Sequence, residues 1–142
     1  MLDKKYAVFT MDVESFADTE CIAKSSEYVD VDVDTLDGFD EYINLLDKHN
    51  IKGTLFTVGT LAPKIADKLK SCIKDGHEIA LHNYIHEAPV DIPLDKFKNG
   101  VLESKCKLSQ MLGTDILGFR APCFGIDNDR LWALQELGFR YD

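Results

Sequence analysis

The fold is decided by residues 76–87, which read Gly76-His77-Glu78-Ile79-Ala80-Leu81-His82-Asn83-Tyr84-Ile85-His86-Glu87. The apolar run 79–81 predicts a short buried strand that delivers His82 to its carboxyl end. His86 follows four residues later, and two imidazoles at this spacing can bind one metal ion if the backbone between them coils through about one turn. Two histidines do not complete a metal site, so the other ligands must come from elsewhere in the chain.

The composition is that of an ordinary globular protein. The chain has 142 residues, of which 45% are hydrophobic and 29% charged, which suits one core but not two, so we expect residues 1–142 to form a single domain. The net charge of −9 argues against nucleic acid and anionic membranes as partners, because phosphate binding needs a basic face. The sequence contains no apolar run long enough for a membrane span and no apolar signal region at its start, which predicts a cytoplasmic protein.

Segments with strand and helix patterns alternate along the chain. This alternation predicts an α/β fold, with a parallel sheet or barrel and helices outside. Polar residues follow the strands, and parallel α/β folds bind ligands at the carboxyl ends of their strands. The acidic alternation at 30–34 fits a short exposed strand or a solvated loop. The expected strands are 6–11, 54–58, 79–81, 116–119 and one from 139 onward, and the expected helices are about 35–49, 63–75, 94–112 and 128–137.

Two carboxylates follow the first strand. Asp12 and Glu14 are two residues apart, so both point to the same side if the backbone stays extended. One of them could bind a metal while the other acts as a base, whereas the alternative is a pair of solvent-exposed acidic residues. With His82 and His86, a carboxylate completes the His₂-carboxylate set of catalytic zinc sites, in which the metal activates water and polarises a carbonyl.

Of two further polar residues, Arg120 is a candidate site residue and His77 is not. Arg120 follows the fourth strand and can hold a carboxylate through two hydrogen bonds, although it could equally form a weak surface ion pair. His77 begins the strand that ends at His82, which places it roughly 16 Å away at about 3.3 Å per residue. We therefore expect His77 to be structural.

Taken in order, several segments resemble the motifs of the polysaccharide deacetylase superfamily (NodB-homology, carbohydrate esterase family four). The resemblance implies an incomplete, distorted (β/α) barrel of the TIM-like type, with about five parallel strands alternating with helices. It also implies metal-dependent hydrolysis of N-acetyl or related acyl groups on a carbohydrate substrate. The segments that carry it are 10–14, 54–59, 76–79, 82–86, 120–122 and 138–142.

The resemblance assigns roles to individual residues. Asp12 matches the general base, and His82 and His86 match the two metal-binding histidines. The usual first motif has two adjacent aspartates, of which the second binds the metal, but Val13 occupies that place here and Glu14 has to take over. The implied metal is Zn²⁺, with Co²⁺, Mn²⁺ and Ni²⁺ as alternatives.

The third motif supplies the remaining implied roles. Arg120 matches the arginine that orients the base. Cys123 stands where many members carry an aromatic residue whose backbone N–H helps to form the oxyanion hole, and a backbone donor survives a change of side chain. Pro122 and Phe124 belong to the same expected substrate and oxyanion loop.

The family's later motifs, which supply an aspartate and the general-acid histidine, lie beyond Asp142. We therefore expect the N-terminal portion of the full fold, carrying the metal-and-base half of the site. Two alternatives stay open: a non-catalytic module that binds metal or sugar, and a cyclic-amide hydrolase or deformylase of the same superfamily. Open strand edges would also favour homo-oligomers.

Overall fold

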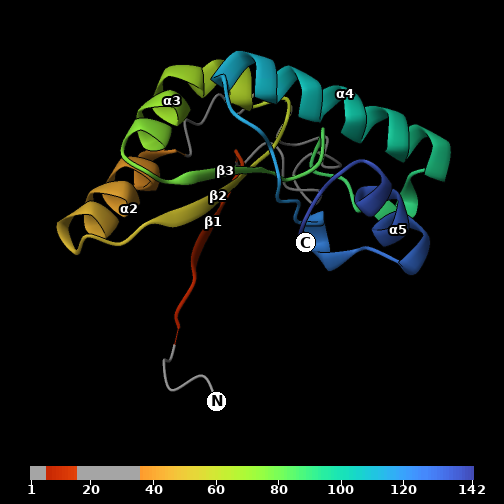
Figure 1. Ribbon diagram of the computed structural model, residues 1–142, viewed down its shortest axis with the longest axis horizontal. Coiled ribbons are helices and arrows are strands. Elements are labelled where there is room, and N and C mark those ends of the chain that lie inside the picture. Colours follow the sequence, from red (N-terminus) through yellow and green to blue (C-terminus); the bar gives the residue numbers. More distant parts are fainter. Residues whose placement is uncertain (1–5, 16–35) are drawn as a thin grey trace, which may run out of the picture.

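The computed structural model describes residues 6–15 and 36–142, which form a parallel sheet with helices along one side (Figure 1). Three strands pair in the order β1-β2-β3, and all of them are parallel. They are β1 (Phe9–Val13), β2 (Gly53–Thr57) and β3 (Glu78–Leu81). The α/β class expected from the sequence is confirmed. The acidic alternation at 30–34 lies outside the described residues.

The helices follow the expected pattern closely. Gly113, in the left-handed conformation with φ 70°, ends the longest helix, and the Asp127 carboxylate caps the last one by accepting a hydrogen bond from the Arg130 N–H. No helix within the described ranges has the length and apolar character that a membrane span requires. The helices are α2 (Asp37–Lys48), α3 (Ala66–Lys74), α4 (Leu94–Leu112) and α5 (Asn128–Glu136), with short 3₁₀ turns η3 (Ala62–Ile65), η4 (Pro89–Asp91) and η5 (Pro122–Phe124).

The strands differ from the expectation in two respects. The first strand includes Asp12 and Val13, because its ladder with β2 is made by the backbone and does not depend on side-chain polarity. The expected fourth and fifth strands appear only as single parallel bridges, Leu81 with Phe119 and Gly118 with Tyr141. These bridges continue the order of the sheet, but each is too short to make a strand. A closed barrel is not seen among the described residues and stays a prediction.

The two faces of the sheet have different roles. Val13, Leu55 and Leu81 are fully buried in the core cluster that the helices complete. Residues in register share a face and alternate along each strand, so Asp12 on β1 and Phe56 on β2 lie together on the opposite face. The sheet therefore separates the core from the face that carries Asp12.

His77 lies at the start of β3, at the end of the sheet away from His82, as the sequence indicated. Its side chain is fully buried. The Gly53 N–H donates a hydrogen bond to its Nδ1 at 3.1 Å, and its Nε2 lies 3.3 Å from Asp47 Oδ1. His77 thus connects the starts of β2 and β3 to the end of α2.

We predict that His77→Ala lowers the free energy of unfolding by about 2–4 kcal/mol, because it leaves a cavity and a buried Gly53 N–H without its acceptor. Urea unfolding would measure this change. The matched control is His49→Ala, since His49 is exposed at the end of α2 and its loss should stay within about 0.5 kcal/mol. Equal effects of the two substitutions would contradict the structural role of His77.

Candidate metal centre and its neighbouring carboxylate

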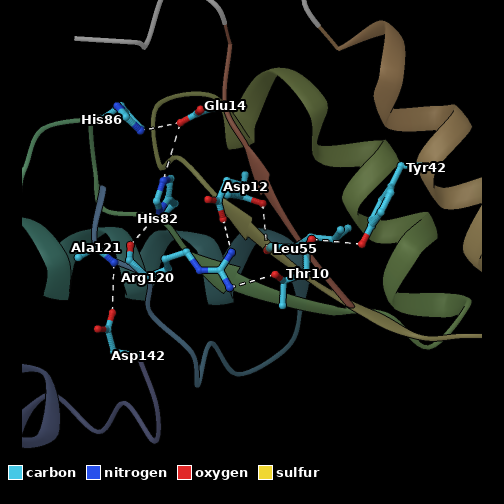
Figure 2. Close-up of polar contacts among 11 residues, drawn as sticks. Thr10, Asp12, Glu14, Tyr42, Leu55, His82, His86, Arg120, Ala121 and Asp142 are labelled. Atoms are coloured by element: carbon cyan, nitrogen blue, oxygen red, sulfur yellow. Dashed lines mark hydrogen bonds and ion pairs between the residues drawn. The ribbon is translucent and has the colours of Figure 1, made fainter. Parts of the chain in front are cut away.

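Three expected ligands converge at the carboxyl ends of β1 and β3 (Figure 2). Glu14 follows β1 directly, and His82 follows β3 directly. Glu14 Oε2 lies 2.6 Å from His86 Nε2 and 3.8 Å from His82 Nε2. One ligand atom from each side chain lies within 4.8 Å of the other two. The structure therefore brings together the three residues that the sequence proposed.

The loop between the two histidines bends sharply. Asn83 has a left-handed backbone with φ 61°. Its side-chain oxygen accepts a hydrogen bond from the Tyr84 N–H, and its side-chain nitrogen donates to the Glu87 carbonyl, both at 2.9 Å. This turn returns the chain toward the sheet, so the rings of His82 and His86 lie 5.2 Å apart, centroid to centroid.

His82 is oriented by a backbone contact. Its Nδ1 lies 2.8 Å from the Arg120 carbonyl oxygen, which can only accept, so Nδ1 carries the proton and Nε2 presents its lone pair toward Glu14. Burial lowers the pKa of His82, although the Arg120 carbonyl acts in the opposite direction. The neutral, oriented imidazole is the form that binds metals.

The donor set fits a divalent transition metal. Two imidazole nitrogens and one carboxylate oxygen are the usual protein ligands of catalytic zinc, and their mutual distances allow them to meet one ion. Val13, at the place where the usual motif has its ligand, points into the helix-side core and is fully buried. The alternation along β1 therefore puts Glu14, two residues after Asp12, on the side of the site.

Asp12 lies beside this cluster and is held by Arg120 (Figure 2). Arg120 Nη1 donates to Asp12 Oδ1 at 2.5 Å, and Nη2 donates to Thr10 Oγ1 at 3.0 Å. The two guanidinium nitrogens contact two residues on the same face of β1. Arg120 is thus tied to both parts of the site, to His82 by its carbonyl and to Asp12 by its side chain.

The loop after Arg120 forms the turn η5. Cys123 and Phe124 both have left-handed backbones, with φ 55° and 53°, and both are exposed. The Phe124 N–H donates to the Ala121 carbonyl at 3.2 Å, and Pro122 has no N–H. The oxyanion donor expected at Cys123 lies in this turn and stays a prediction.

Three contacts of the site were not predicted from the sequence. The Thr10 hydroxyl accepts a hydrogen bond from Arg120. The Phe56 ring lies beneath the Arg120 guanidinium. Asp142 accepts a hydrogen bond from the Ala121 N–H at 3.1 Å. Thr10 could have been found, because it precedes Asp12 by two residues and so shares its face. The other two contacts depend on the pairing of distant segments.

Comparisons with known proteins agree with this architecture. The family model described as polysaccharide deacetylase matches residues 23–141. A peptidoglycan deacetylase of Helicobacter pylori is 26% identical over 105 residues, which are 74% of this chain and 36% of that protein. A peptidoglycan deacetylase-like protein of Gibberella zeae is 32% identical over 108 residues, which are 74% of this chain and 32% of that protein.

A solved structure is also similar to this chain in its fold. The crystal structure of a candidate polysaccharide deacetylase from Mycobacterium smegmatis superposes with a TM-score of 0.75 and 27% identity, covering 93% of this chain and 48% of that one. The chain therefore spans about a third of the length of the two curated relatives and about half of this solved structure.

We predict that the neutral His82 ring of the metal-free protein carries its proton on Nδ1, as two-bond ¹H–¹⁵N correlation spectra would show. Because burial lowers the pKa of His82 below its ordinary value of about 6.5, the unfolded chain takes up this proton first on acidification. The His82 contribution to the free energy of unfolding should therefore decrease as the pH falls through about 6.5. A proton on Nε2 of the neutral ring would contradict the contact with Arg120.

Proposed function

The chain belongs to the polysaccharide deacetylase family, and on that premise we propose that it is a metal-dependent hydrolase that removes N-acetyl or related acyl groups from a carbohydrate. The observation that carries the proposal is a carboxylate, Asp12, held by Arg120 beside a cluster of three metal-type ligands. A base next to a metal centre is the arrangement that hydrolysis of an amide or ester needs.

In this proposal, Glu14, His82 and His86 hold a divalent ion, with Zn²⁺ as the first candidate and Co²⁺, Mn²⁺ and Ni²⁺ as alternatives. Such an ion, when bound, supplies Lewis-acid activation of water and of the acyl carbonyl. The Arg120 carbonyl keeps the His82 ring in one orientation and one tautomer.

Asp12 acts as the general base and takes a proton from the attacking water. Arg120 orients its carboxylate through Nη1 and is itself anchored on Thr10 through Nη2. The second carboxylate oxygen of Asp12 is then available to the water. Proton transfer by a positioned base typically contributes about 10²–10⁴-fold in rate.

The turn η5 completes this half of the site. A backbone N–H directed at the developing oxyanion stabilises it strongly, because the donor is already in place when the charge forms. We assign this donor to the Cys123 amide, with Pro122 shaping the turn and Phe124 lining the substrate side.

The relatives suggest where to look for a substrate. The Helicobacter pylori relative is a peptidoglycan deacetylase. We therefore propose N-acetylated glycans as the substrate class, and chito-oligosaccharides and peptidoglycan fragments as the first compounds to assay.

We predict that the metal-free protein binds Zn²⁺, and that Glu14→Gln, His82→Ala and His86→Ala each weaken binding at least about 10-fold, because each removes a donor. Calorimetric titration would measure these affinities. His49→Ala serves as the matched control, since this exposed histidine directly follows α2, outside the site. Absence of zinc binding, or unchanged affinity in both His82→Ala and His86→Ala, would exclude the proposed centre.

We predict that Asp12→Asn lowers metal-dependent acetate release from chito-oligosaccharides by about 10²–10⁴-fold, because the amide cannot accept the proton. Zinc affinity should stay unchanged. Asp40→Asn, which removes an exposed carboxylate on α2, is the control and should keep full activity. A wild-type chain that binds zinc but hydrolyses no acetylated sugar, formylated sugar or cyclic amide would favour the non-catalytic alternative.

A further inference from the structure

We propose that Phe56 is a positioning residue, whose ring supports the Arg120 guanidinium so that Arg120 holds Asp12 in one place. The catalytic consequence of this contact rests on the proposed function, but the contact itself can be tested without it. Phe56 is 3% exposed and lies near the carboxyl end of β2. By sequence alone it is an ordinary apolar residue of a buried strand.

The geometry of the sheet brings these three residues together. Phe56 is the register partner of Asp12, so both side chains stand on the same face of neighbouring strands. Arg120 comes from the segment bridged to the far side of β3 and has to cross that face to reach Asp12. Ala80, in register with Phe56 on β3, has only a methyl group and leaves this path open.

The Arg120–Phe56 contact is a cation–π interaction. Cζ of Arg120 lies 3.9 Å from the centroid of the Phe56 ring. A guanidinium over an aromatic face is attracted by the ring quadrupole, and its N–H groups stay available for hydrogen bonds. Here those N–H groups reach Asp12 and Thr10. The ring therefore restricts a long, flexible side chain without using any of its hydrogen-bond donors.

Tyr141 braces the Phe56 ring in turn. The Tyr141 and Phe56 rings lie 6.3 Å apart at an angle of 85°. Tyr141 occupies the space above Gly118, because a Cβ at that position would lie 2.3 Å from the Tyr141 ring. Glycine at 118 thus makes room for the tyrosine, the tyrosine positions the phenylalanine, and the phenylalanine supports the arginine.

This stack predicts a specific separation of effects. The ring contacts of Phe56 described above are with Arg120 and Tyr141, neither of which is a proposed metal ligand, so its loss should disturb Asp12 while zinc binding persists. We expect Phe56→Leu to lower kcat by about 2- to 30-fold, the range of a partly desolvated cation–π contact. KM and zinc affinity should stay within about 2-fold, and Phe56→Tyr, which keeps the ring face, should restore most of kcat.

A double-mutant cycle tests the coupling. In an Arg120→Ala background, Phe56→Leu should cause no further loss of kcat, because the partner that it positions is gone. Additive losses would overturn the proposal.

An NMR measurement tests the Arg120–Phe56 contact even if the protein releases no acetate. In the wild-type chain the Arg120 Nε–H proton should be shifted upfield by the ring current, and Phe56→Leu should abolish this shift. Phe97→Leu is the matched control, because Phe97 is 1% exposed and packs on Phe119 on the helix side of the sheet. An unchanged Arg120 signal in Phe56→Leu, or the same loss in Phe97→Leu, would overturn the positioning role. A retained shift in a wild-type protein without activity would overturn only the proposed function.

Discussion

The hydrogen bonds of Arg120 are the interaction on which the site depends. Its carbonyl orients His82, and its guanidinium holds Asp12, which lies 108 residues earlier in the sequence. One residue therefore sets the position of His82, a proposed metal ligand, relative to the Asp12 carboxylate. The backbone contact is fixed by the bridge between Leu81 and Phe119, whereas the side-chain contact needs support from its surroundings. The Phe56 ring under the guanidinium is placed to give that support.

Much of the fold and part of the site could be predicted because their causes are local. Apolar runs ended by Gly, Pro or polar residues define β2, β3 and α4 within a few positions, and the histidine spacing indicated the centre. Glu14 was predictable as a neighbour of Asp12 in the site, because residues two apart on an extended strand point to the same side.

Contacts that depend on strand register could not be predicted in this way. The pairing of Asp12 with Phe56, and the reach of Arg120 across that face, follow only when distant segments are aligned. For a related reason, the sequence did not show that the expected fourth and fifth strands are reduced to single bridges. A ladder needs a partner over several residues, and the bridges at Phe119 and Tyr141 each provide one pair. An apolar run can indicate where a strand belongs in a sheet, but it does not determine how far its pairing extends.

The alternation of β1 has a consequence for how such a protein can change over time. Met11 and Val13 pack toward the helices, while Thr10 and Asp12 belong to the Arg120 network. Adjacent positions are therefore constrained by different requirements, one by packing volume and the other by hydrogen bonding. A lineage could replace the chemistry of this strand without rebuilding its core, and could refine the core without altering its chemistry.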